Sequence, residues 1–189
     1  LDGVLLDVAC ARTETYPAPG ENPLVQFGSI EQDLARRDFT VNAMALLLRA
    51  DGTQQLFDPH RGREHLAKRQ LAFLHEASVA DDPTRIVRGA RYCARLDFQL
   101  TADALVQIQS TLAVWPWAWR PGDPIDVVPP ALGTRLRMEL ELLLDRDTGL
   151  DLVGMLRIPQ VDRFVPRFRK FVPQLVSLLL FRNLHVDHL

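Results

Sequence analysis

The segments of this chain that have strand patterns all lie within its first 75 residues, whereas the rest of its 189 residues carries helical patterns. A buried strand is predicted for the short apolar segment "VLLDVACA" (4–11), which follows Gly3. Two further strands, around a turn at Asp51-Gly52, are predicted for "MALLLRADGTQQLFD" (44–58). A run of strands followed by a run of helices is typical of an α+β fold. We therefore expect a small mixed sheet with helices, followed by an all-α region.

Capping signals predict where several helices begin. Ser29 and Gln32 have the spacing of a capping box, so a helix is expected to begin after Ser29 and to run toward Asn42. Thr101 is a good N-cap residue for another helix. Five prolines between residues 114 and 130 interrupt the pattern. The other expected helices cover residues near 63–68, 83–96, 101–112 and 132–144, with a proline-interrupted helical stretch from 151 onward.

Composition excludes some classes of protein. The formal net charge is −2, so no overall basic field indicates a nucleic-acid partner. Lys68 and Lys170 are the only lysines; the bias toward arginine reflects either phosphate recognition or a GC-rich genome. Cys10 and Cys93 are too few for a disulfide framework, which predicts a reducing compartment, the cytoplasm. No apolar run approaches the ~20 residues of a membrane helix, so no membrane partner is expected.

The segment with the most informative chemistry is "DDPTRIVRGARY" (81–92). Asp82 and Arg85 are three residues apart and share a face of the predicted helix. Cytosine and adenine both present an amino donor beside a ring-nitrogen acceptor, so a carboxylate and a guanidinium together match them and mismatch uracil and guanine. The alternative is an ordinary helix start, with an aspartate N-cap, a proline and a surface ion pair. The segment taken alone favours that alternative.

Four segments occur in an order that resembles the class II tRNA nucleotidyltransferases (CCA-adding enzymes) and the bacterial poly(A) polymerases. They are "RRDFTVNAMA" (36–45), "LFDPHRG" (56–62), "DDPTRIVRGARY" (81–92) and "RLRMELELLL" (135–144). The resemblance covers roughly residues 1–150 and implies a polymerase-beta-like nucleotidyltransferase head followed by helical neck and body domains. The expected division is a partial head over 1–75, a neck over 76–148 and a partial body over 149–189.

The resemblance also implies a nucleotide site. Arg37, Asp38 and Asn42 would hold the ribose and phosphates of the incoming nucleotide, although Asn42 could instead cap a helix end. Arg36 would either join them or remain a solvated charge. Asp82 and Arg85 match the protein template that selects CTP and ATP. The residues predicted to bind nucleotide are Arg36, Arg37, Asp38, Asn42, Asp81, Asp82, Arg85, Arg88 and Arg91.

Several matches to the family are less direct. Asp81 stands where the family usually has glutamate, so its reach is one methylene shorter. Arg88 and Arg91 either support the template and the phosphates or form buried ion pairs. The remaining matches are expected to be structural: Asp58 between head and neck, and Arg135 and Glu139 in the neck, where they brace the template helix by an ion pair.

Members of the family need Mg²⁺ on a strand-borne Asp-x-Asp and a glycine-rich segment for the triphosphate. Neither feature precedes residue 7, and Asp145-Arg146-Asp147 follows the predicted neck helix, which is the wrong place. Asp7 is a candidate accessory carboxylate. We therefore expect an N-terminally truncated chain that is inactive alone, with its main metal ligands missing.

The expected function of the parent protein is template-independent addition of CMP and AMP from CTP and ATP to the 3′ end of tRNA. A poly(A) polymerase or a CC- or A-only enzyme is the alternative within the family, and a non-catalytic nucleotide- or RNA-binding remnant is the alternative outside it. "WPWAW" (115–119) either stacks on bases or packs on the neck, and the second is favoured. "RFVPRFRKF" (163–171) is interpreted as an amphipathic body helix rather than an RNA contact.

Overall fold

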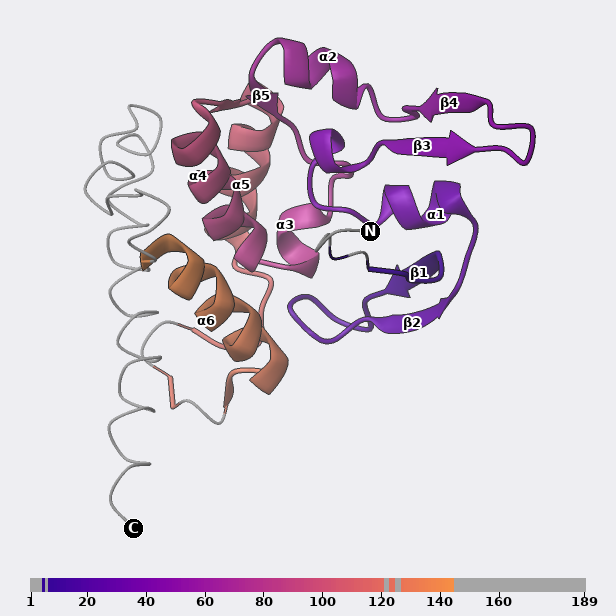
Figure 1. Ribbon diagram of the computed structural model, residues 1–189. Coiled ribbons are helices and arrows are strands. Elements are labelled where there is room, and N and C mark those ends of the chain that lie inside the picture. Colours follow the sequence, from indigo (N-terminus) through magenta and orange to yellow (C-terminus); the bar gives the residue numbers. More distant parts are fainter. Residues whose placement is uncertain (1–4, 6, 121–122, 125–126, 145–189) are drawn as a thin grey trace.

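The computed structural model describes residues 5, 7–120, 123–124 and 127–144, and these form an α+β fold (Figure 1). Short strands and helices make up the first part, and longer helices pack together in the second part (Figure 1). The first part contains β1 Arg12–Thr15, β2 Leu24–Phe27, α1 Ile30–Ala35, the 3-10 helix Thr40–Asn42, β3 Ala45–Leu48, β4 Gln54–Phe57, α2 Gly62–Ala67 and β5 Gln70–Leu71. The second part contains α3 Ser78–Asp81, α4 Thr84–Leu96, β6 Gln99–Leu100, α5 Ala102–Val114 and α6 Pro130–Leu144.

Three of the predicted local signals are present in the structure. Ser29 and Gln32 form a complete capping box at the start of α1. The Thr101 side chain accepts a hydrogen bond from the amide of Ala104 and caps α5. β3 and β4 pair antiparallel on either side of the Asp51-Gly52 turn. In each case the residues that specify the structure are close together in the sequence.

The strand predicted over 4–11 is wrong for the described residues. Residues 7–10 are exposed and lie outside any strand, and Val8 is 97% exposed. The strand in this region is β1, four residues long, which pairs antiparallel with β2 from Arg12 opposite Phe27 to Thr15 opposite Leu24. A strand is stable where its backbone groups find partners, and β2 supplies them only to this later segment.

The first predicted helix ends earlier than expected. α1 stops at Ala35, and Phe39 adopts an extended conformation with φ −125° and ψ 149°. This conformation places the Phe39 ring in the core, 5.2 Å from the ring of Phe73 and 5.8 Å from that of Tyr92. Burial of the ring therefore overrides continuation of the helix.

The boundary between strands and helices is also less strict than predicted. β6 at Gln99–Leu100 follows α4 and pairs in parallel with β5, so one short strand of the second, helical part pairs with a strand of the first part.

The main apolar core lies among α3, α4, α5 and α6 and includes buried Trp117 and Trp119. The packing interpretation of the "WPWAW" segment is therefore confirmed. In the part of the chain that the structure describes, no helix has the length and apolar character needed to cross a membrane.

Phe39→Ala is expected to lower the free energy of unfolding by roughly 3–5 kcal/mol, because it leaves a cavity where a fully buried ring packs. Phe27→Ala is the matched control, since the Phe27 ring is 88% exposed, and its effect should stay within ~0.5 kcal/mol. Urea denaturation of both variants measures the difference. Equal losses would contradict the assigned core.

Candidate functional site

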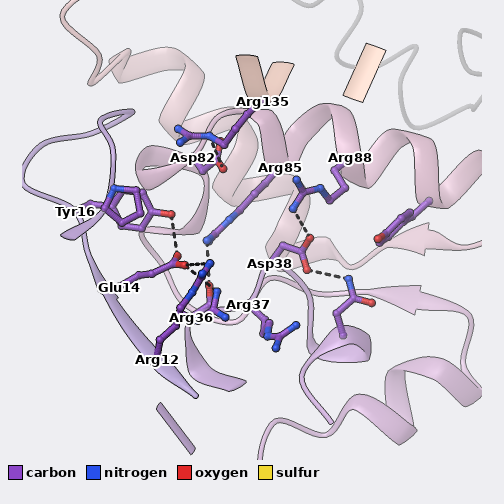
Figure 2. A pocket seen from close by; sticks show the side chains of 13 residues that line it. Arg12, Glu14, Tyr16, Arg36, Arg37, Asp38, Asp82, Arg85, Arg88 and Arg135 are labelled. Atoms are coloured by element: carbon purple, nitrogen blue, oxygen red, sulfur yellow. Dashed lines mark hydrogen bonds and ion pairs between the residues drawn. The ribbon is translucent and has the colours of Figure 1, made fainter. Parts of the chain in front are cut away.

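A pocket of about 630 Å³ lies where β1, residues 36–42, the start of α4 and α6 come together (Figure 2). Its lining contains six arginines and three carboxylates, a surplus of three positive charges, although the whole chain has a net charge of −2. A concave surface with such a surplus attracts anions. The lining residues are Arg12, Glu14, Tyr16, Pro23, Arg36, Arg37, Asp38, Asn42, Asp82, Arg85, Arg88, Tyr92 and Arg135.

One buried carboxylate behind the pocket fixes two adjacent arginines. Asp33 Oδ1 accepts hydrogen bonds from Arg36 Nη2 at 2.7 Å and Nε at 3.1 Å, and Oδ2 accepts one from Arg37 Nη2 at 2.7 Å. Burial alone would raise the pKa of Asp33, but hydrogen bonds from Arg37, Arg36 and the Arg12 amide lower it to about 2. The family motifs miss Asp33, although its spacing of three and four residues from the arginines was a visible signal.

Glu14, on β1, holds Arg36 from the other side. Its Oε1 accepts from Arg36 Nη1 at 2.8 Å and from Arg12 Nη2 at 2.9 Å, and its Oε2 is 3.5 Å from the Tyr16 hydroxyl. Burial raises the pKa of Tyr16, against the lowering effect of the Arg85 charge, so the phenol remains protonated at neutral pH. No local sequence signal predicts the contact between Glu14 and Arg36, because 22 residues separate them.

Asp38 is held in one orientation by three neighbours. Its Oδ1 accepts from the Phe39 amide at 2.8 Å and from Asn42 Nδ2 at 2.9 Å, and its Oδ2 accepts from Arg88 Nη1 at 2.9 Å. Burial alone would raise the pKa of Asp38, but the hydrogen bonds from Asn42 and Arg88 and the Arg88 charge lower it. The carboxylate is therefore ionised at neutral pH.

Helix α6 reaches this cluster through Glu139. Its Oε1 accepts from Arg88 Nε at 2.6 Å, and its Oε2 accepts from Arg91 Nη2 at 3.0 Å. Burial would lower the pKa of Arg88, but the hydrogen bond to Asp38 and the charge of Glu139 raise it. Arg91 is buried, pairs with Glu139 and does not line the pocket, which favours the ion-pair alternative over a direct nucleotide contact.

Asp82 and Arg85 both line the pocket, but they are held by different partners (Figure 2). Asp82 Oδ1 accepts from the amide and the hydroxyl of Thr84, at 3.0 and 2.6 Å, and Oδ2 lies 3.3 Å from Arg135 Nε. Arg85 donates to two carbonyl oxygens, one of them that of Arg36 at 3.2 Å. Arg135 and Glu139 thus pair separately with residues of the 82–91 segment, from one face of α6.

Besides Arg91 and Glu139, which pair with each other, three of the predicted residues lie outside the pocket lining. Asp81 is half-buried, with Oδ2 4.0 Å from His75 Nδ1, and burial raises its pKa. Asp58 accepts from the amides of the first two residues of α2, at 2.6 and 3.0 Å, and so caps that helix. Asp7 is exposed and outside any strand, which corrects its expected position as a strand-borne carboxylate.

The part of the chain that the structure describes contains no group of three or more His, Cys, Asp or Glu side chains that could hold a metal ion. The pocket carboxylates Glu14, Asp38 and Asp82 each face arginines instead. Asp145-Arg146-Asp147 and "RFVPRFRKF" (163–171) lie outside the described residues.

Comparison with known proteins gives several similar sequences. Residues 2–72 match a family described as the poly A polymerase head domain. The chain is 43% identical over 113 residues to the CC-adding tRNA nucleotidyltransferase of Deinococcus radiodurans, which covers 60% of this chain and 30% of that protein. It is 36% identical over 152 residues to the A-adding tRNA nucleotidyltransferase of Aquifex aeolicus, which covers 80% and 17%. The chain thus spans less than a third of the length of these relatives.

Solved structures give a consistent result. The chain is similar to the apo form II of a CCA-adding enzyme, with a TM-score of 0.65 and 29% identity over 86% of this chain and 34% of that one. It is also similar to a tRNA nucleotidyltransferase complexed with a primer tRNA and an incoming ATP analogue, with a TM-score of 0.57 and 28% identity over 74% and 37%.

Glu139→Gln is expected to lower the free energy of unfolding by ~3 kcal/mol, because two guanidinium groups lose a buried counter-charge. The matched control on the same helix is Glu141→Gln, which breaks an exposed ion pair with Arg137 and should cost less than ~1 kcal/mol. Chemical denaturation measures both. A Glu139→Gln loss no larger than that of the control would contradict the bracing role.

Acid should weaken the Asp33 cluster in a defined window. The pKa of Asp33 is lowered from 3.8 to about 2, so its stabilisation is present above pH ~4 and is lost as the pH falls toward 2. Asp33→Asn should therefore flatten the dependence of the melting temperature on pH between 4 and 2. Parallel curves for the wild type and the variant would show that Asp33 does not carry this stabilisation.

Proposed function

We propose, since this chain belongs to the family of class II tRNA nucleotidyltransferases and bacterial poly(A) polymerases, that it carries the nucleotide-binding part of a template-independent RNA nucleotidyltransferase. The substrates are CTP, ATP and the 3′ end of tRNA. In the reaction, the terminal 3′-hydroxyl attacks the α-phosphate of the nucleotide and releases pyrophosphate. A cytoplasmic location is part of this proposal, supported by the two free cysteines, Cys10 and Cys93.

The observation that carries the proposal is the composition of the pocket. Six arginines and three carboxylates line a cavity of about 630 Å³, so the site offers a polyanion both charge and directed donors. The guanidinium groups of Arg36 and Arg88 are already oriented by the carboxylates of Asp33, Glu14 and Glu139. A nucleoside triphosphate therefore meets arginines that lose little conformational entropy on binding.

Phosphate and ribose contacts are assigned to the segment after α1. The Arg37 side chain is 44% exposed at the pocket, so it has donors available for phosphate oxygens. Asp38 is an ionised acceptor and suits a ribose hydroxyl, which would distinguish ribonucleotides from deoxyribonucleotides. Asn42 acts through Asp38, whose orientation it fixes.

Base selection is assigned to Asp82 and Arg85. Thr84 occupies Oδ1 of Asp82 with two hydrogen bonds, which leaves Oδ2 to accept from an exocyclic amino group. Arg135, 3.3 Å from Oδ2, must share or yield that oxygen when a base binds. Arg85 would exchange a carbonyl partner for the ring nitrogen of cytosine or adenine. Guanine and uracil present the opposite order of donors and acceptors.

The pocket draws residues from both parts of the predicted division into a head over 1–75 and a neck over 76–148. We assign Asp38 and its neighbours to the head and Asp82, Arg85 and Arg135 to the neck. The shape of the pocket then depends on how the head and the neck pack against each other. The predicted body from 149 onward lies outside the described residues.

Mg²⁺ is the metal that the family implies, but the described residues do not fit a Mg²⁺ site. Glu14, Asp38 and Asp82 are each neutralised by arginine, and no three carboxylates converge in the described part of the chain. We propose that the isolated 189-residue chain binds nucleotide without transferring it, and incubation with tRNA, Mg²⁺ and labelled ATP tests this directly.

The alternatives within the family remain CC-only addition, A-only addition and poly(A) synthesis. Similar proteins with CC-adding, A-adding and multifunctional CCA names all occur at comparable identity. The residues that read the base serve all of these activities. Product length on a denaturing gel separates them.

Asp82→Ala combined with Arg85→Ala is expected to reduce the preference for CTP and ATP over UTP and GTP by ~tenfold or more, because both hydrogen bonds to the base are lost. Calorimetric titration of the four nucleotides measures the preference. Arg137→Ala is the control, since Arg137 is an exposed arginine on α6 outside the pocket lining. Unchanged preference in a folded double variant would remove the base-reading assignment.

A further inference from the structure

The loop between β1 and β2 (residues 16–23) has one buried residue in an otherwise accessible segment. Gly20 is buried, whereas its neighbours on both sides, 17–19 and 21–22, are exposed. The two ends of the loop, Tyr16 and Pro23, line the nucleotide pocket. Gly20 therefore lies between the two loop residues that contribute to the pocket wall.

Gly20 lies directly against the indole of Trp117. A Cβ at this position would lie 2.8 Å from Trp117 Cδ1, and the backbone has φ +77°. Both conditions favour glycine, since other residues rarely adopt this φ and a methyl group would meet a ring fixed in the core. The contact joins residues about one hundred positions apart in the chain, one in the strand-rich part and one after α5.

Gly20 and Trp117 also satisfy two successive backbone carbonyls just before Asp82. The Gly20 amide donates to the Asp81 carbonyl at 3.2 Å, and Trp117 Nε1 donates to the Ala80 carbonyl at 2.8 Å. These carbonyls lie at the end of α3, where a helix leaves such groups without helical partners. Both hydrogen bonds therefore fix the backbone that leads directly into the base-reading carboxylate.

A second contact connects the same loop to Asp82. Arg135 Nη1 donates to the Asn22 side-chain oxygen at 3.3 Å, while Arg135 Nε lies 3.3 Å from Asp82 Oδ2. The loop thus contacts both the backbone that precedes Asp82 and Arg135, the arginine that lies next to Asp82 Oδ2. A displacement of the loop would therefore change both the backbone position before Asp82 and the position of the Arg135 side chain.

We propose that Gly20 and Trp117 are positioning residues. Their contact, called the Gly20–Trp117 latch below, holds the 16–23 loop against the end of α3 and thereby sets the preference of the pocket for ATP and CTP over GTP. The latch acts through Asp82, whose backbone it fixes, and through Tyr16 and Pro23, which it holds at the pocket wall. This inference rests on the proposed function of the pocket. It gives the tryptophan-rich segment a role in nucleotide selection without contact with a base.

The first test is Gly20→Ala, with Gly52→Ala as the matched control. Gly52 also has positive φ, +80°, but a Cβ there meets no atom within 4 Å, and it lies in the β3–β4 turn away from the pocket. The two variants therefore share the backbone strain and differ in the contact with Trp117. The measurements, on the intact protein, are amide hydrogen exchange of residues 16–23 and equilibrium binding of ATP, CTP and GTP.

Gly20→Ala is expected to accelerate exchange in the loop and to reduce the ratio of ATP to GTP affinity by ~tenfold, while Gly52→Ala changes neither. A purely structural role would lower the affinity for all three nucleotides equally and leave the ratio unchanged. That result, or unaltered exchange in the loop, overturns the latch.

Trp117→Phe is the second test of the proposal, and it can be used if Gly20→Ala fails to fold. It retains an aromatic ring and removes the donor to the Ala80 carbonyl, so it should shift the ATP to GTP ratio in the same direction. Wild-type selectivity in Trp117→Phe would also overturn the proposal. If the wild-type protein binds neither ATP nor CTP, the proposed function itself is wrong. If the wild-type protein binds both and the variants bind with unchanged selectivity, only the role of Gly20 and Trp117 is wrong.

Discussion

The chain of charges from Glu139 through Arg88 to Asp38 is the interaction on which the site depends. It connects α6, α4 and the segment after α1 with hydrogen bonds of 2.6 and 2.9 Å. Glu139 and Asp38 are buried, so each would be costly without a partner, whereas together with Arg88 they hold the helical part against the strand-rich part. The pocket lies at this junction, and its shape therefore depends on the same contacts.

Two neighbouring pocket arginines are oriented by carboxylates, one of which, Asp33, lies outside the pocket lining, whereas the other, Glu14, belongs to it. Asp33 holds Arg36 and Arg37, and Glu14 holds Arg36 from the opposite side. The pocket lining still keeps a surplus of three positive charges, because six arginines outnumber three carboxylates in it, although the net charge of the whole chain is −2. Overall charge therefore says little about whether this protein binds an anion, and the charges that line the pocket say much more.

Sequence signals predicted the parts of the fold that short stretches specify, such as the Ser29–Gln32 capping box and the Asp51-Gly52 hairpin. They could not predict the pairing of β6 with β5, because that register is set by contacts between residues almost thirty positions apart. The ordered motifs identified most of the pocket arginines, together with Asp38 and Asp82. They missed Glu14 and the contact of Gly20 with Trp117, which arise only when distant segments pack together.

The most direct measurement is a crystal structure of the intact protein with CTP bound. We expect hydrogen bonds from the cytosine amino group to Asp82 Oδ2 and from Arg85 to the neighbouring ring nitrogen or carbonyl, with the Arg135 contact to Asp82 lengthened or shared. A base bound elsewhere, with Asp82 still paired to Arg135 and Arg85 still on the Arg36 carbonyl, would contradict this expectation.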